Sequence, residues 1–336
     1  MERYIELKRT KMMDEAAKGH RPLSFFMSFV RFVLLYMVAT FAMGIITSVP
    51  TVIYLLRDTD FGRLFTEAMT GKITPEEFEA ATGNIVLKMP DYVTVVTLLA
   101  TALLIVAAIV YCKVFEKRKV SSLGLRRGNV GPEYFIGLLI GLAMIGLTFL
   151  IAYASGSVTF SLNANGIAPV ILLYFVGYII QGAAEEIFVR GYFMVSISRD
   201  YNLWIAVIFS SLVFSFLHAG NTGIGILPYI NLTLFGIFEA VYICKRGNIW
   251  GACAIHSIWN FVQGNVLGIS VSGMPKHPSV FITESDPSRV WANGGNFGLE
   301  GGFACTIVLL VAIGIVLLAK TKESEISVLE KPLETE

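Results

Sequence analysis

Two adjacent glutamates and an arginine interrupt a long apolar run of this chain. In the stretch GAAEEIFVRGYF the charged residues are Glu185, Glu186 and Arg190. An ionisable side chain at the centre of a bilayer costs at least about 2.5 to 3.5 kcal/mol, so three of them need a reason. Glu186 and Arg190 are four residues apart, so on a helix they share a face and can pair. Glu185 points elsewhere on that helix and needs a different partner inside the protein.

Two of the four histidines also lie within apolar runs. His218 ends the stretch FSFLH, with Phe214 one turn before it, and His256 begins HSIWN, with Asn260 one turn after it. Taken singly, each of these residues is more readily explained as a polar contact between helices. Together with Glu185 they offer a carboxylate, two imidazoles and a carboxamide from three separate segments. That inventory suits an acid/base site that splits an amide.

In such a site a carboxylate and a histidine remove a proton from water. A second histidine and an asparagine donate hydrogen bonds to the oxyanion that develops on the carbonyl group. Glu185 is the candidate for the base. A surround of low dielectric raises the pKa of a carboxyl group and strengthens each hydrogen bond to the transition state. Burial of these charges therefore has a chemical purpose.

The composition indicates an integral membrane protein. Of the 336 residues, 55% are hydrophobic and only 15% are charged, and the mean hydropathy is +0.68, which exceeds what one soluble core could hide. The net charge of +1 gives no argument for a nucleic-acid partner. The four cysteines show no CxxC spacing, so neither a disulfide framework nor a thiolate zinc site is indicated.

The apolar segments predict an all-α, polytopic fold of about eight transmembrane helices around a bundle core that contains the active site. The predicted spans are 23–49 (extending as far as 56), 92–115, 134–154, 167–197, 203–220, 229–244, 249–267 and 301–319. The predicted regions are a cytoplasmic lead (1–22), two helices with an external loop 57–91 (23–119), a catalytic core (120–267), a second external loop (268–300), and a last helix with its tail (301–336).

The positions of the basic residues predict the orientation. Lys and Arg gather in the lead, in 113–127, in KRG at 245–247 and in KTK at 320–322, so both termini are predicted to be cytoplasmic. Helix lengths then predict a site between mid-bilayer and the cytoplasmic face. TPEEF in the loop 57–91 predicts short external helices, whereas 268–300 is predicted to be irregular.

Three motifs, in this order on successive apolar segments, carry a family resemblance. EExxxR, FxxxH and HxxxN resemble the motifs of the CPBP family, which covers type II CAAX prenyl endopeptidases and the bacteriocin-processing or self-immunity (Abi) proteins. The resemblance spans about 120–267 and includes SSLGLRR and KRGNIW. It implies that Glu185 and His218 activate water and that His256 and Asn260 stabilise the oxyanion. It also implies that three residues support the site: Glu186, Arg190 and Phe214.

A metal-dependent mechanism is the main alternative. Glu185, His218 and His256 are a sufficient ligand set for a catalytic zinc ion with an open position. The chain has no HExxH motif, and an asparagine is better suited to an oxyanion than to zinc. The sequence therefore favours a site with no metal and no other cofactor.

The function expected from these observations is intramembrane hydrolysis of a peptide bond in a peptide or membrane-associated protein. The lipid bilayer is the other expected partner, and the resemblance implies a bacterial plasma membrane. The alternatives are a non-catalytic binding protein, such as an immunity or scaffold factor, and a transporter. Glu239 departs from the family, in which a small residue is typical, and is expected to extend towards Lys245 and the cytoplasm or else to line the cavity.

Overall fold

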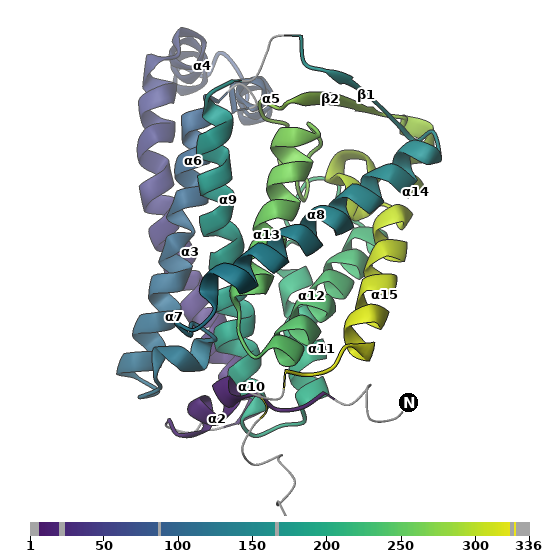
Figure 1. The fold of residues 1–336 in the computed structure, drawn as a ribbon. Coiled ribbons are helices and arrows are strands. Elements are labelled where there is room, and N and C mark those ends of the chain that lie inside the picture. Colours follow the sequence, from purple (N-terminus) through teal and green to yellow (C-terminus); the bar gives the residue numbers. More distant parts are fainter. Residues whose placement is uncertain (1–6, 20–23, 87–88, 165–167, 323–325, 327–336) are drawn as a thin grey trace, which may run out of the picture.

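The computed structural model describes residues 7–19, 24–86, 89–164, 168–322 and 326. The first six residues of the predicted lead, its residues 20–22, and the tail beyond 322 apart from residue 326 lie outside the described residues. Within the lead, a short helix, α2, spans Lys11–Ala17. Figure 1 shows the helices running side by side between the end that holds α2 and the opposite end, which holds β1, β2, α4 and α5.

Each predicted span is helical in the structure. The corresponding elements are α3 (Phe25–Arg57), α6 (Asp91–Ala100) with α7 (Ala102–Val114), α8 (Val130–Ala154), α9 (Val170–Glu186) continued by η2 (Ile187–Met194) and α10 (Val195–Ser198), α11 (Leu203–Phe216), α12 (Ile226–Arg246), α13 (Trp250–Phe261) continued by η3 (Val262–Val266), and α15 (Phe303–Leu318).

Eight complete spans are not confirmed. Within the described residues, five helices are long and apolar enough to cross a membrane, with α6 and α7 counted as one and α9, η2 and α10 as another. Helices α11, α13 and α15 have 14, 12 and 16 residues. A helix needs about 20 apolar residues to cross the hydrocarbon core, so these three are short. The fold is nevertheless mostly helical, as predicted.

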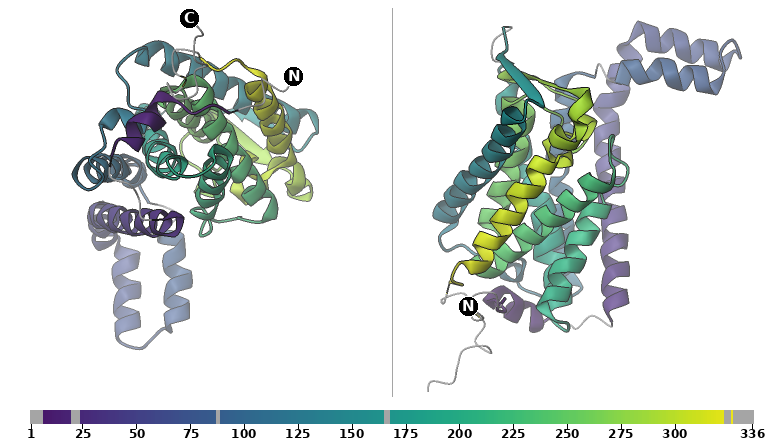
Figure 2. Two further views of the ribbon diagram at one scale, coloured as in Figure 1. Left: turned by 90° about the horizontal axis from the view of Figure 1, so that it is seen from below. Right: turned by 90° about the vertical axis from the view of Figure 1, so that its right-hand side faces the viewer.

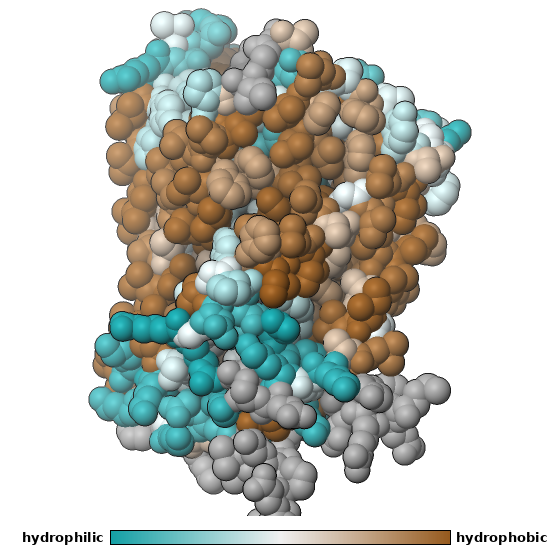
Figure 3. Space-filling view, viewed as in Figure 1, coloured by the Kyte–Doolittle hydropathy of each residue, from teal (hydrophilic) through white to brown (hydrophobic). Residues whose placement is uncertain are grey.

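The outer surface is apolar where a soluble protein would be polar. Phe41 on α3 is 74% exposed, and similar exposed side chains occur along α8, α9 and α15. Figure 3 shows hydrophobic residues covering the middle of the molecule, with hydrophilic residues gathered mainly at the end near α2. A belt of this kind is stable only against lipid. The protein is a multi-pass integral membrane protein.

The basic segments meet at the end of the molecule that holds α2. The backbone N–H of Lys322 donates to the carbonyl oxygen of Lys245 at 3.0 Å, and Trp250 Nε1 donates to the carbonyl oxygen of Arg126 at 2.8 Å. At the other end, α4 (Thr59–Met69) and α5 (Pro75–Val86) form a hairpin that projects sideways (Figure 2). Thr74 and Glu77 bond to each other's backbone N–H, which confirms the capping box and the predicted short helices.

Two short strands correct the prediction that the loop 268–300 is irregular. β1 (Val158–Leu162) pairs antiparallel with β2 (Phe281–Ser285), with Val158 opposite Ser285. Both strands are rich in β-branched and aromatic residues, which favour extended structure. Short 3₁₀ and α-helical turns follow: η4 (Pro287–Arg289), α14 (Val290–Asn293), η5 (Gly295–Phe297) and η6 (Leu299–Gly301). A further 3₁₀ turn, η1, spans Val120–Leu123.

Glycines allow two helices to approach α13 closely. A Cβ atom on Gly137 of α8 would lie 2.3 Å from the carbonyl oxygen of Gly251, and one on Gly182 of α9 would lie 2.8 Å from the backbone nitrogen of Ser257. Both distances are shorter than any real contact of a Cβ atom allows. Gly182 lies one turn before the paired glutamates, and Ser257 follows His256. The close approach therefore brings the first and third motifs together.

Candidate active site

Helix α9 ends at the two glutamates, and a π-helical segment begins directly after them. The α-helix includes Glu186, and η2 runs from Ile187 to Met194 with every side chain buried. A π-helical turn is rare and occurs frequently at functional sites. A second one, η3, begins two residues after Asn260. Both motifs that supply buried polar groups are thus followed by the same local distortion.

Glu186 and Arg190 form the buried pair that their spacing predicts. Arg190 Nη1 lies 3.1 Å from Glu186 Oε1, and both side chains are 0% exposed. The same oxygen lies 2.9 Å from Nδ1 of His256. The guanidinium carbon of Arg190 lies 4.2 Å from the centre of the Phe214 ring. Phe214 therefore contacts the charged pair, and its supporting role stays a prediction.

Glu185 points to different groups from its neighbour, as predicted. Its Oε1 accepts a hydrogen bond of 2.6 Å from Gln181 Nε2, and its Oε2 lies 3.7 Å from Nε2 of His256. Gln181 in turn accepts a hydrogen bond of 2.9 Å from Asn260 Nδ2. The two glutamates thus lie at opposite nitrogens of one imidazole ring. Glu186 orients the ring, and Glu185 lies beside the nitrogen that reaches the cavity.

His218 comes from the turn after α11. Its Nδ1 lies 2.9 Å from the backbone carbonyl oxygen of Phe214, to which it can only donate. In the neutral ring this leaves Nε2 without a proton and able to accept one. No hydrogen bond joins His218 to Glu185 within the described residues.

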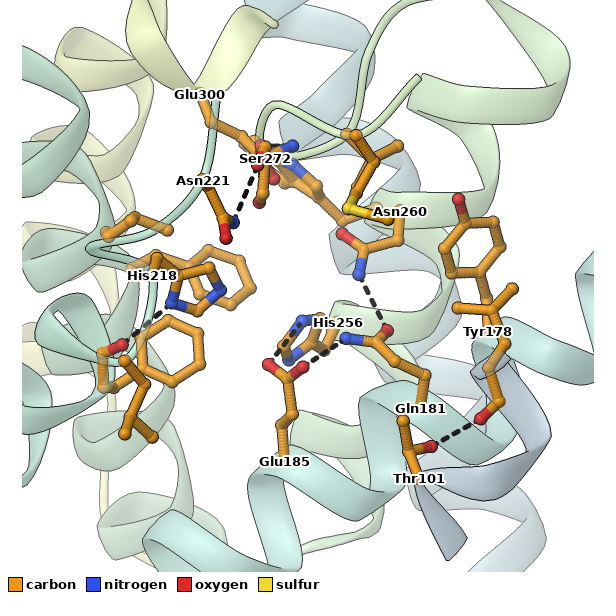
Figure 4. Close-up of a pocket in the computed structure, with 18 of the residues that line it drawn as sticks. Thr101, Tyr178, Gln181, Glu185, His218, Asn221, His256, Asn260, Ser272 and Glu300 are labelled. Atoms are coloured by element: carbon orange, nitrogen blue, oxygen red, sulfur yellow. Dashed lines mark hydrogen bonds and ion pairs between the residues drawn. The ribbon is translucent and has the colours of Figure 1, made fainter. Parts of the chain in front are cut away.

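The four predicted catalytic side chains line one cavity of about 270 Å³ (Figure 4). Glu185, His218, His256 and Asn260 all contribute to its wall, as does the supporting Phe214. Glu186 and Arg190 are absent from the lining and lie behind it. Five of the predicted residues can therefore touch a molecule in the cavity, whereas Glu186 and Arg190 cannot.

Sequence reasoning missed several polar residues of the same cavity. Gln181 bridges Glu185 and Asn260, and its position one turn before Glu185 on the same helix was the available signal. Asn221, Ser272 and Glu300 form the other polar part of the lining, with Asn221 Nδ2 donating to the Ser272 carbonyl oxygen at 2.8 Å. Ser272 and Glu300 come from a region predicted to be an irregular loop, where periodicity carries no signal.

The cavity extends away from the end that holds the basic residues. Its lining includes Val271, Met274, His277 and Glu300, from the region that Figure 1 shows at the end opposite α2. Among the described residues, none of the basic segments contributes to it. The predicted depth of the site, between mid-bilayer and the cytoplasmic face, stays a prediction. On the side of the basic residues, Phe188 and Val189 of the buried η2 form part of the cavity wall.

Glu239 neither reaches solvent nor lines the cavity, so both expectations for it are wrong. Its side chain is 0% exposed, and neither carboxylate oxygen has a hydrogen-bond partner among the described residues. The charges that act on it are those of Glu186 and Arg190. Helix α12 continues to Arg246, so Glu239 lies well inside the bundle, too deep to reach its end.

The predicted zinc ligands do not form a metal site in this arrangement. Among the described residues, no group of three or more His, Cys, Asp or Glu side chains is close enough to hold a metal ion. Glu185 Oε1 is engaged by Gln181, and Nδ1 of both histidines is directed to protein acceptors. Nε2 of neither histidine makes a hydrogen bond to such an acceptor among the described residues, and the choice between the metal-free and the zinc mechanism stays a prediction.

Comparison with known protein families agrees with the motifs. Residues 167–262 match the family described as type II CAAX prenyl endopeptidase Rce1-like. The matched region contains all three motifs, whereas Ser272 and Glu300 lie beyond it. No curated protein matches the chain significantly. Over this region the chain is similar to the Rce1-like type II CAAX prenyl endopeptidases.

Proposed function

We propose that the protein is an intramembrane endopeptidase that hydrolyses a peptide bond of a peptide or membrane-associated protein. The observation that carries the proposal is that Glu185, two histidines and Asn260, from three separate segments, line one cavity. The family match adds a protease as the coarse activity. A polar site of this composition inside an apolar bundle costs stability, which a catalytic role explains.

Water is activated by Glu185 and His218. A water molecule between the two side chains gives its proton to the Glu185 carboxylate, while the unprotonated Nε2 of His218 accepts its other hydrogen bond. The water oxygen then forms a bond to the carbonyl carbon, and the carbonyl π electrons move to oxygen. Gln181 holds Glu185 Oε1 at 2.6 Å, so the other oxygen, Oε2, is the one that receives the proton.

The oxyanion is held on the opposite side of the carbonyl. His256 and Asn260 supply N–H groups to it from Nε2 and Nδ2. Glu186 accepts from Nδ1 of His256, and in the imidazolium form, which the two neighbouring carboxylates stabilise, Nε2 carries the second proton and donates towards the cavity. When the tetrahedral intermediate collapses, the C–N bond breaks and the proton held by Glu185 passes to the leaving amine nitrogen. The carboxylate is thereby restored.

The test uses the purified full chain in lipid nanodiscs with a peptide library analysed by mass spectrometry. Wild type is expected to cleave a subset of peptides. Glu185→Gln and His218→Ala are each expected to lower the rate by about 10²- to 10⁴-fold, the usual contribution of acid/base catalysis. Glu284→Gln, at an exposed position of β2, serves as the matched control and is expected to cleave as wild type does.

Two results would contradict the proposal in different ways. If Glu185→Gln cleaved as fast as wild type, the protein would have another catalytic base or no peptidase activity of its own. If a chelator abolished cleavage and added zinc restored it, the peptidase activity would stand but its metal-free mechanism would fall.

A further inference from the structure

Glu300 is a buried cavity carboxylate that lies outside the region matched to the family. It belongs to η6 and is 8% exposed. Its Oε2 accepts hydrogen bonds from the backbone N–H of Ser272 at 2.7 Å and from the Ser272 hydroxyl at 2.9 Å. Asn231 Nδ2 donates to the backbone carbonyl oxygen of Glu300 at 2.7 Å. Backbone and side chain of Glu300 are thus both held, so the carboxylate has a defined position in the cavity wall.

The charges around the cavity are unbalanced. Its described lining contains two carboxylates, Glu185 and Glu300, and neither a lysine nor an arginine. The hydrogen bonds to Glu300 come from neutral donors, Ser272 and Gln263, so none of them brings a positive charge to the carboxylate. His218, another lining residue, acts on Glu300 electrostatically, and its Nδ1 is engaged by a backbone carbonyl. A desolvated carboxylate is most stable beside a cation.

The position of Glu300 relative to the proposed base suits a neighbouring subsite. Figure 4 shows Glu300 and Glu185 entering the cavity from opposite sides, with His218 along the wall between them. A peptide with its scissile carbonyl group beside Glu185 and His256 would extend an adjacent residue towards Glu300. A positive charge on that residue would be attracted, whereas a carboxylate there would be repelled.

We infer that Glu300 is a specificity residue that selects substrates carrying an ammonium group close to the scissile peptide bond. This inference rests on the proposed peptidase function and names the substrate class of that same site. A lysine side chain and a free N-terminal amine would both supply the ammonium group. Substrates with a free carboxylate at that position are disfavoured.

The experiment compares four fluorogenic peptides that share one sequence. One carries lysine next to the cleaved bond, one carries glutamine there, and each is made with a free and with an acetylated N-terminus. Wild type is expected to cleave the acetylated lysine peptide at least about tenfold more efficiently (kcat/KM) than the acetylated glutamine peptide. If the recognised ammonium group is instead the N-terminus, the peptides with a free N-terminus are cleaved more efficiently than the acetylated ones, whether they carry lysine or glutamine.

Variants then assign the preference to Glu300. Glu300→Gln keeps an oxygen that can accept from Ser272 but has no charge, so the ratio between charged and neutral peptides is expected to fall to about one. Glu300→Asp keeps the charge and is expected to retain part of the ratio. Glu284→Gln is expected to leave the ratio unchanged. Because each ratio is taken within one variant, a general loss of folding or activity cancels.

Peptide binding, measured by fluorescence anisotropy, separates this inference from the proposed function. If wild type cleaves the charged and neutral peptides equally, the peptidase stands and the role of Glu300 is wrong. If wild type cleaves none of them but binds the charged peptide at least about tenfold more tightly, and Glu300→Gln removes the difference, the cation site stands without the peptidase. No charge preference in either measurement overturns the inference.

Discussion

Glu186 and His256 are separated by 70 positions in the chain, yet Oε1 of Glu186 lies 2.9 Å from Nδ1 of His256. The same oxygen also accepts from Arg190. One buried oxygen therefore joins the first motif to the third and fixes the orientation of the imidazole. Glu185, the adjacent residue, lies beside the other ring nitrogen and lines the cavity.

Removal of the Glu186 carboxylate should destabilise the fold. Glu186→Ala would leave Arg190, which is fully buried, without its counter-ion, and breaking one side of a buried pair costs about 3 to 5 kcal/mol. We expect a lower midpoint of thermal unfolding in detergent. Glu76→Ala, at an exposed position of α5, is the control and should unfold as wild type does. An unchanged midpoint for Glu186→Ala would show that the pair contributes nothing to stability.

Replacement of Gln181 should slow catalysis more than it affects folding. Gln181→Leu removes both hydrogen bonds that connect Glu185 with Asn260. A displacement of a catalytic base by about 1 Å can lower the reaction rate about 10²-fold. We therefore expect kcat to fall about 10- to 100-fold with a smaller change in KM. Val176→Ala, on an exposed face of the same helix, is the control. Wild-type kcat in Gln181→Leu would rule out a positioning role.

Replacement of Glu239 should stabilise the fold, whereas replacement of Glu186 should destabilise it. The carboxyl group of Glu239 is fully buried and has no hydrogen-bond partner among the described residues, which costs about 1 to 3 kcal/mol. Glu239→Leu removes that cost, and Arg190 still has Glu186 as its partner. We expect the unfolding midpoint to rise. A fall as large as that of Glu186→Ala would instead identify Glu239 as a required second counter-ion of Arg190.

The charge preference of the cavity should depend on pH. Burial raises the pKa of Glu300 above the ordinary glutamate value, against the opposing effect of the hydrogen bonds from Ser272 and the charge of His218. The carboxylate is ionised only above this raised pKa, so the preference for a lysine peptide should increase as the pH rises and vanish as it falls. Tyr178 and Cys305 also interact with Glu300, but both are neutral in this range.

The ratio of kcat/KM for the lysine and glutamine peptides between pH 5 and pH 8 measures this dependence. In Glu300→Gln the ratio should be flat over the whole range. A slope that persists in Glu300→Gln would assign the titration to another group, with His218 as the candidate.

The sequence determined the elements and indicated the candidate reactive groups. Hydrophobic runs can be read locally because lipid selects for length and apolarity, and each predicted span is a helix in the structure. The spacing of Glu186 and Arg190 predicted their pairing, because residues four apart share a helix face. The motif trio also indicated the family that the comparison found. The predicted span lengths were too long for α11 and α15, which are shorter than hydropathy predicts.

Only the tertiary structure decided which polar groups meet and which way the cavity extends. Gln181 joins Glu185 to Asn260, and Ser272 joins Glu300, through contacts between segments that the sequence does not order in space. Phe188 and Val189 of the buried η2 line one part of the cavity, and loop residues such as Ser272 line another. Such contacts depend on how several helices pack together, and close packing sets side-chain positions that no local pattern encodes.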